Sequence, residues 1–453
     1  MLSIDVSKIP PFVNIATKKS GTESYTVRTL DPEFISNQDI SNRIYRSMIS
    51  DENDNIISIA PPKSLPNDDF LRSFTTDSNS TFSKFSGKII SDSVKAEEII
   101  EGTMINLFYV KSTGKWEIAT KKSVGGNYHF FRNQYFPDLE EEQKTFLQMF
   151  LDGFKNPEKT LDECIRAIPG FDESFCYSFV LQHPANHIVV PIVKPAIYLV
   201  HMCRIMSDHD GKPAYKYVDP DRELFKNTCV QFPRKYNICH DTIDRSFDST
   251  LENVFDGKKY YDQLFENIKK TIENPLNSHI IPGIMVTQLE TGFRTSFINA
   301  KYAEVKILRG NNPNLHYQYL VLRKINKVAA FERYFPQYKT YFDRFETHFM
   351  AFATRIHQLY INVHVLKITT LAELTDKKDK YHVEKLHYER YLPMVKASKD
   401  ASVLKEPKAS KNASNESKDL KELKPKITRK IVIEYLDSEN VMVPLGTYAS
   451  VIS

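Results

Sequence analysis

The sequence predicts an α+β protein, in which a body rich in antiparallel strands is followed by a helical C-terminal domain. Two observations lead to this fold class. Up to about Leu320, short β-branched segments alternate with turn residues, which is typical of antiparallel hairpins. From Phe331 to Leu366, aromatic and apolar residues recur every three or four positions, which is typical of amphipathic helices.

Glycine is scarce, and its scarcity excludes two large classes of nucleotide-binding protein. Only 14 of the 453 residues are Gly, whereas an average protein has about 7%. None of them falls in the dinucleotide pattern G-x-G-x-x-G or in the P-loop pattern G-x-x-x-x-G-K-[ST], so a Rossmann enzyme and a P-loop NTPase are excluded. Five glycines lie between Gly87 and Gly126 together with the only tryptophan, which makes that stretch the first place to look for a functional site.

The strands expected in the body begin with two hairpins. One spans Ile44 to Ile59 around the turn sequence DENDN, and the other spans Thr103 to Thr120 around KSTG. Apolar residues at helical spacing behind an acidic start predict a helix from Leu139 to Phe154. Further strands are expected over Ser174–Gln182, Ile188–Val193, Ala196–Met202, Ile280–Gln288 and Arg294–Asn299.

The C-terminal third predicts helices, then a linker, then a strand. The aromatic stripe is expected to be a helix-packing core, with a base-stacking surface as the alternative. Residues 396–428 are rich in Lys and Ser and predict a flexible linker. A short apolar run from Ile431 to Leu436 predicts a strand. The expected segments are an N-terminal extension (1–40), the body (41–322), the helical domain (323–395), the linker (396–428) and a terminal β segment (429–453).

Charge, cysteine content and hydropathy limit the cellular compartments and the binding partners that can be expected. The net charge is +4, and Lys396 to Lys430 alone holds eleven basic and five acidic residues, so attraction to RNA is expected from local patches or from this tail. The five cysteines form no C-x-x-C pair, so we expect reduced thiols and no metal site. No signal peptide and no apolar span long enough for a membrane helix are evident, so we expect a cytoplasmic location, or the host cytoplasm or virion if the protein is viral.

Polar residues around the second hairpin form a candidate phosphate site. Glu101, Gly102 and Thr103 stand at the mouth of the hairpin, and Lys121 and Lys122 follow its second strand. A glycine at such a place lets the backbone approach a phosphate or a base, and paired lysines supply positive charge. The same pattern also fits a surface turn beside two solvated lysines.

Four short motifs follow one another along the body. They are Tyr45-Arg46-Ser47, Pro61-Pro62-Lys63-Ser64-Leu65, Ile99-Ile100-Glu101-Gly102-Thr103 and Thr120-Lys121-Lys122-Ser123. Over roughly residues 41–324 their order resembles the phage-type ATP-dependent RNA ligases of the covalent nucleotidyltransferase superfamily, in the form carried by large DNA viruses. The resemblance implies a nucleotidyltransferase (adenylation) domain that uses ATP and Mg²⁺ to form a lysyl-AMP and then joins RNA ends. It also implies nucleotide-binding roles for Arg46, Glu101, Gly102, Thr103, Lys121 and Lys122.

The sequence departs from that family at the reacting positions. Ile99 stands where the family has its nucleophilic lysine, and an alkyl side chain cannot form a bond to phosphorus. The carboxylates and lysines of three later motifs are replaced as well, at Phe179-Val180, Pro282-Gly283 and Ser296-Phe297-Ile298. Lys63 is the candidate substitute nucleophile and Lys95 a second one, while a phosphate-contacting or exposed lysine is the alternative for Lys63.

Two functions therefore remain open. The first is an RNA-ligase-like protein that binds nucleotide or RNA and, if catalysis survives, is an ATP-dependent RNA ligase or a related nucleotidyltransferase. The second is a non-catalytic structural or interaction protein on a degenerate ligase scaffold, with protein partners in a viral particle or replication complex. Salt-dependent RNA binding favours the first, and a stable protein partner without RNA affinity favours the second.

Overall fold

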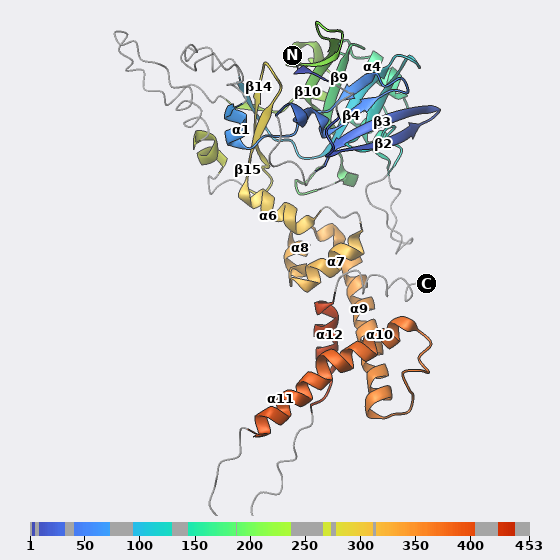
Figure 1. Ribbon diagram of the computed structural model, residues 1–453. Coiled ribbons are helices and arrows are strands. Elements are labelled where there is room, and N and C mark those ends of the chain that lie inside the picture. The colour runs from blue at the N-terminus through green and yellow to red at the C-terminus, as the bar shows by residue number, and fades with distance from the viewer. Residues whose placement is uncertain are drawn as a thin grey trace, which may run out of the picture. The chain divides into compact units, whose positions relative to one another are not determined.

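The structure is a computed structural model that describes residues 2–4, 9–31, 40–72, 94–128, 144–186, 188–236, 266–272, 278–310, 314–403 and 425–439. The chain forms two compact units, and after residue 140 the boundary between them falls at Ile307 and Leu308 (Figure 1). All described strands belong to the first unit, and the second is helical. The predicted α+β class is thereby confirmed. The body ends at Ile307, 15 residues before its predicted end at residue 322.

The described strands of the first unit form three sheets. The largest has the strand order β1-β11-β10-β9-β7-β8 and carries β12 in addition, beside β10. Every pair in it is antiparallel except β10 with β12. Its strands are β1 (Leu2–Ser3), β7 (Thr103–Val110), β8 (Lys115–Ala119), β9 (Phe175–Gln182), β10 (Ala196–Ser207), β11 (Pro213–Val218) and β12 (Val230–Gln231).

The two smaller sheets are antiparallel throughout. One has the order β13-β6-β14-β15 and the other β2-β3-β4-β5. Their strands are β6 (Val94–Glu98), β13 (Lys235–Tyr236), β14 (Gly283–Gln288), β15 (Arg294–Ile298), β2 (Val13–Ser20), β3 (Glu23–Leu30), β4 (Met48–Ser50) and β5 (Ile56–Ile59). The prediction of a separate N-terminal extension is wrong, because β3 pairs with β4 and makes these residues part of the body.

Successive side chains of the largest sheet point to opposite faces, and an apolar core covers each face. Leu107 and Phe179 pack with Phe150 of helix α3 (Phe146–Gly153) and with α4 (Leu161–Arg166) on one face. Phe108 and Cys203 pack with the β2-β3-β4-β5 sheet on the other face. Successive strand residues point to opposite faces, so both can be apolar in a strand covered on two sides. The remaining helical segments of this unit are η3 (Ile40–Arg46), α1 (Asn67–Arg72), η6 (Pro184–Asn186), η7 (Arg222–Phe225), residues 266–272 and α6 (Ala300–Arg309).

Helix α3 begins later than the predicted residue 139, within the described part of that segment. The Thr145 side chain accepts from the N–H of Gln148, and the Gln148 side chain accepts from the N–H of Thr145. This capping box satisfies two backbone donors at the first turn and fixes the start of the helix. Residues 139–143 lie outside the described part of the chain.

The second unit packs its helices on the aromatic stripe. Phe342, Phe345, Phe349 and Phe352 of α9 are each at most 2% exposed, so the stripe is a helix-packing core as predicted. Helix α12 lies against α9 (Figure 1). The segments are α7 (Leu315–Lys324), α8 (Val328–Tyr334), η8 (Pro336–Tyr338), α9 (Lys339–Tyr360), η9 (Ile361–Val365), α10 (Lys377–Leu386), η10 (His387–Tyr391), α11 (Leu392–Val403) and α12 (Arg429–Ser438).

Two further C-terminal predictions need correction. The apolar run Ile431–Leu436 predicted as a strand lies in the helix α12, since Thr428 caps it and Val432, Tyr435 and Leu436 recur at helical spacing on its buried side. The rest of the predicted β segment, residues 440–453, lies outside the described part of the chain. The first residues of the predicted linker, up to Val403, continue helix α11, and residues 404–424 lie outside the described part of the chain.

The expected strand Ile188–Val193 is also wrong, because these residues form bends and irregular backbone. In the ranges that the structure describes, no helix is both long and apolar enough to cross a membrane.

Acid is expected to weaken the helical unit through His382. This ring is fully buried, its Nδ1 lies 3.0 Å from the Tyr435 hydroxyl, and burial lowers its pKa from 6.5 to about 4. Between these two pKa values the unfolded chain binds a proton that the folded chain does not, so the free energy of unfolding falls as the pH drops, by up to about 1.4 kcal/mol per pH unit. Urea unfolding followed by helical circular dichroism from pH 7.5 to 4.5 measures it.

The matched variant is His382→Gln, which keeps a hydrogen-bonding side chain but cannot take up a proton. It should show a shallower dependence of stability on pH in the same window. An identical pH dependence in both proteins would mean that His382 is not responsible.

Candidate functional site

A cavity of about 290 Å³ lies in the first unit, where the β13-β6-β14-β15 sheet faces the largest sheet. This volume is at the lower end of the roughly 300–1,000 Å³ found for small-molecule sites. Strands β6, β14 and β15 contribute to its walls from one sheet, and β7, β9 and β10 from the other. Its lining residues are Arg46, Lys63, Ser64, Glu97, Glu98, Ile99, Ile100, Gly102, Met104, Val180, Val200, His201, Pro233, Met285, Thr287, Arg294, Ser296 and Ile298.

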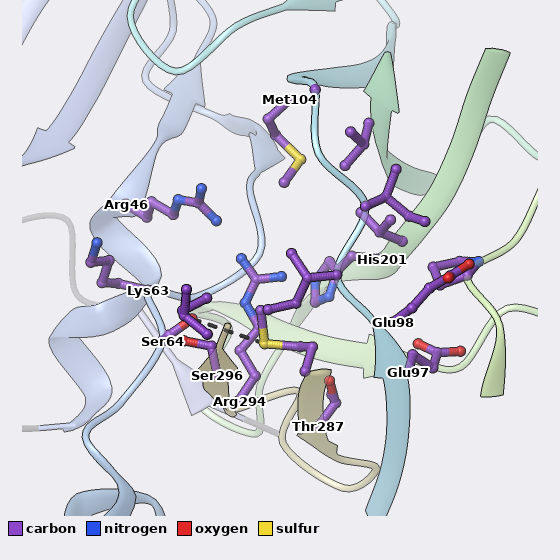
Figure 2. A pocket seen from close by; sticks show the side chains of 18 residues that line it. Arg46, Lys63, Ser64, Glu97, Glu98, Met104, His201, Thr287, Arg294 and Ser296 are labelled. Carbon is purple, nitrogen blue, oxygen red and sulfur yellow. Dashed lines mark hydrogen bonds between the residues drawn. The ribbon is translucent and has the colours of Figure 1, made fainter. Parts of the chain in front are cut away.

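One side of the cavity is cationic. Figure 2 shows the side chains of Arg46 and Arg294 reaching into the same space, with Lys63 on the side of Arg46. Arg294, on β15, is only 7% exposed, and its Nε donates to the carbonyl oxygen of Pro62 at 3.0 Å. Burial lowers the pKa of Arg294 to about 9, and the charge of Arg46 acts in the same direction. The fold therefore holds a guanidinium out of water at the wall of a cavity.

These cations are not neutralised within the described part of the chain. No ion pair there joins Arg46, Lys63 or Arg294 to a carboxylate. Burial lowers the pKa of the Lys63 amine, and the charges of Arg46, Lys121, Arg294 and Arg43 lower it further. Positive charges gathered in this way favour a bound anion, because an anion offsets both their burial and their mutual repulsion.

His201 adds a neutral ring to the wall. It lies on β10, is 2% exposed and has its Nε2 3.1 Å from the Tyr215 hydroxyl. Burial holds its pKa well below the ordinary 6.5, and the charges of Arg294 and Lys95 act in the same direction. The ring is therefore uncharged at neutral pH and adds a hydrogen-bonding group without adding charge.

The opposite side of the cavity is acidic (Figure 2). Glu97 pairs with Lys95 at 3.0 Å and with Arg222 at 2.7 Å, and Glu98 accepts from the N–H of Arg234 at 2.9 Å. The amine of Lys95 also pairs with Asp219 at 2.7 Å, so this second candidate nucleophile is held between two carboxylates. An amine held by two ion pairs is not free to approach a phosphorus atom, so Lys95 is a poor nucleophile.

The residues present do not fit a divalent metal held by the protein alone. No group of three His, Cys, Asp or Glu side chains able to hold a metal ion occurs among the described residues. Both acidic residues of the cavity are already engaged by cations or by backbone N–H groups. Mg²⁺ prefers several oxygen ligands in octahedral geometry, which these two side chains do not supply.

The sequence motif at the second hairpin divides between the cavity and its support. Gly102 lines the cavity, but Glu101 turns into the protein, where it accepts from the N–H groups of Val189 and Val190 at 2.8 Å each. Thr103 accepts from the Asn186 side chain at 2.7 Å. Glu101 and Thr103 thus hydrogen-bond to Asn186, Val189 and Val190. The sequence had predicted that Glu101 and Thr103 contact a nucleotide.

The remaining predicted residues lie on or near the cationic side. Arg46 and Lys63 line the cavity. Lys121 lies close enough to Arg46 for that charge to lower the pKa of the Lys121 amine beyond the effect of burial, and its backbone oxygen accepts from the Ser47 hydroxyl at 3.0 Å. Lys122 is exposed and does not line the cavity.

Sequence reasoning missed Arg294 and His201. Arg294 stands two residues before Ser296-Phe297-Ile298, so a basic residue at the start of the strand expected over Arg294–Asn299 was an available signal. Nothing in the sequence marks His201, which is one of 13 histidines and lies within an apolar strand.

Comparison with known proteins gives limited similarity to RNA ligases. No family model matches the chain. An RNA ligase of Rhodothermus phage RM378 is 27% identical over 135 residues, which are 29% of this chain and 27% of that protein, so the match spans about a quarter of the relative's length.

Two solved structures of archaeal ATP-dependent RNA ligase are similar in a loose sense. Form 1 is 11% identical with a TM-score of 0.33, over 87% of this chain and 78% of that one. Form 2 is 10% identical with a TM-score of 0.30, over 86% and 76%.

Gly102 is expected to be indispensable for the cavity. Its φ is +155°, and a Cβ there would lie 2.3 Å from the backbone oxygen of Leu181. Gly102→Ala should therefore lower the free energy of unfolding by about 3 kcal/mol or more. Gly114→Ala is the control, because its φ of +66° is strained but its nearest neighbour is 3.6 Å away, and it should lose about 1 kcal/mol. Urea unfolding followed by Trp116 fluorescence measures both, and equal losses would contradict the packing argument.

Proposed function

We propose that the protein is an RNA-ligase-like protein that binds the phosphate-bearing end of a nucleotide or RNA in the cavity without forming a covalent adenylate on residue 99. The observation that carries the proposal is the buried guanidinium of Arg294, which faces the cavity with Arg46 and Lys63 and has no carboxylate partner in the described part of the chain. Phosphate suits this arrangement, because an arginine fork donates two parallel hydrogen bonds to its oxygens.

The similarity to a phage RNA ligase supports the choice of ligand. That relative is named for RNA ligation, and the match covers only part of each chain, so substrate and activity come to this protein as proposals. ATP is the nucleotide that the family resemblance implies, with magnesium arriving on its phosphates. The setting expected from the sequence, a viral protein in the host cytoplasm or virion, is proposed on the same basis.

Ile99 supports binding without the standard covalent step. It lines the same cavity as the three cations, at the position where the resembled family has its lysine. An isoleucine has no lone pair with which to attack phosphorus, so no covalent intermediate can form at this position. What the remaining residues can do is bind the anion, orient it and shield it from water.

A second function, self-adenylylation on Lys63, is favoured by the electrostatics around its amine. Burial and neighbouring cations lower the pKa of Lys63, which raises the fraction of neutral, nucleophilic amine. In that reaction the Nζ would bond to the α-phosphorus of ATP, the bond from that phosphorus to the bridging oxygen would break, pyrophosphate would leave, and the amine proton would pass to solvent.

Binding is expected to depend on Arg294. At a hundredfold excess over the dissociation constant, ATP or a 5′-phosphorylated RNA should stabilise the wild-type protein by about 2.7 kcal/mol. Arg294→Gln should lose this stabilisation, while its unfolding without ligand should be no easier, because a neutral side chain needs no charge desolvation. Thermal unfolding with and without ligand, alongside titration calorimetry, measures both.

Arg204→Gln is the matched control for this experiment. Arg204 lies on β10 outside the cavity and packs over Phe175, so its loss removes the same charge from the same unit. The control should bind like the wild type. Equal ligand stabilisation in wild type and Arg294→Gln would refute the proposed site, and a stable protein partner without any nucleotide or RNA affinity would favour the structural alternative.

Covalent chemistry is expected to be absent from the wild-type protein. After incubation with α-labelled ATP, with and without magnesium, a denaturing gel should show no labelled protein. A label that Lys63→Ala removes would replace binding alone with self-adenylylation on Lys63. A label that survives Lys63→Ala would place the nucleophile at another residue and would contradict both functions.

A further inference from the structure

We propose that a second hollow, at the tip of the β2–β3 hairpin, binds a phosphodiester group of a single-stranded nucleic acid whose terminal phosphate lies in the cavity. The inference rests on the proposed function and adds to it a second subsite and a direction for the strand. Both subsites belong to the first unit.

The hollow has a volume of about 280 Å³ and is lined by groups that can donate hydrogen bonds. Its charged residues are Lys18 and Lys19 of β2, and Ser123 and Asn127 line it from the loop that follows β8. No carboxylate lines it, and in the described part of the chain neither lysine takes part in an ion pair. A space surrounded by ammonium, hydroxyl and amide donors suits a phosphate. The full lining is Lys18, Lys19, Ser20, Gly21, Ser123, Val124, Gly125, Asn127 and Tyr128.

The two walls of the hollow are held together by close packing. Gly125 has a φ of +91°, and a Cβ there would lie 2.6 Å from the Ser20 hydroxyl, so only glycine lets the loop approach the hairpin this closely. The Ser20 hydroxyl donates to Glu117 at 2.8 Å, and the Gly125 N–H donates to the backbone oxygen of Ile118 at 2.8 Å. The hollow is thus a formed part of the fold, because both of its walls are bonded to β8.

One short loop leads from the hollow toward the cavity. Ser123 lines the hollow, and Lys121, which does not itself line the cavity, lies in the field of Arg46, which does. The Cα atoms of Lys121 and Ser123 can be at most about 7 Å apart, because one residue spans at most about 3.6 Å. Between them stands the exposed Lys122, which neither site uses. The cations that follow this route are Arg46, Lys63, Lys121, Lys122, Lys18 and Lys19.

A polymer of phosphates fits this track better than a free phosphate or a mononucleotide does. A mononucleotide can occupy the cavity but leaves the hollow and Lys122 unused. A strand with its terminal phosphate at Arg294 can place later phosphodiesters at Lys122 and at the hollow, and grooves that follow a single strand are built from such basic residues. The track would therefore guide the strand away from the cavity.

The test measures affinity against strand length. The probes are 5′-phosphorylated oligoadenylate RNAs of one to eight nucleotides, with fluorescence anisotropy or calorimetry at several salt concentrations. Affinity should rise with length until the strand reaches the hollow. The double variant Lys18→Gln/Lys19→Gln should lower the affinity for strands that reach the hollow by about tenfold or more, and should leave mononucleotide binding unchanged. It should also reduce the slope of log K against log salt by about 0.7 for each phosphate that the variant no longer neutralises.

The matched control is Lys155→Gln/Lys159→Gln, which removes two exposed lysines from the α3–α4 connection, outside both sites. It should keep the length dependence. If the mononucleotide binds but Lys18→Gln/Lys19→Gln leaves the affinity for long strands intact, the second subsite is refuted while the proposed function stands. If no probe binds, the proposed function itself fails.

The same series in DNA separates phosphate recognition from 2′-hydroxyl recognition. If affinity rises with strand length in either polymer and the double variant does not reduce that rise, the subsite is refuted as well.

Discussion

Gly102 is the point at which the chain crosses from one sheet to another, and the cavity depends on that crossing. Strand β6 ends at Glu98 in the β13-β6-β14-β15 sheet, and β7 begins at Thr103 in the largest sheet. The crossing is short because Gly102 lies so close to the backbone of Leu181 that a residue with a Cβ atom would not fit at this position. The carboxylate of Glu101 ties the same crossing to Val189 and Val190. Ile99, Ile100 and Gly102 of this crossing consequently line one wall of the cavity.

The cationic side of the cavity is a feature that stability alone would not select. The guanidinium of Arg294 is buried and has no carboxylate partner among the described residues, which costs desolvation free energy, and placing Arg46 and Lys63 beside it adds repulsion. Such local costs are typical of binding sites, where the ligand supplies the missing charge. Ile99 lines the same cavity and has no nucleophilic atom, so the chemistry of the cavity points to recognition of an anion and not to covalent transfer at residue 99.

How much the sequence could predict depended on the range of the interactions. The hairpin β7–β8 and the aromatic core of α9 follow from local patterns, and both are confirmed. The strand expected at Ile188–Val193 failed because Glu101, 88 residues from Val189 in the chain, takes backbone N–H groups that a strand would need. Arg294 was missed for the same reason, since its burial beside Pro62 joins residues 232 apart in sequence. Local sequence patterns do not show contacts between residues so far apart in the chain.

If the cavity holds an intact phosphate group by charge and hydrogen bonding, a crystal structure of the protein grown with ATP will show that group in place. We expect an unbroken triphosphate with oxygens within hydrogen-bonding distance of Arg294 and Arg46, roughly 2.7–2.9 Å for such charged pairs, and no bond from phosphorus to any side chain. A cavity without nucleotide beside nucleotide bound elsewhere, or continuous density from the α-phosphorus to the amine of Lys63, would contradict it.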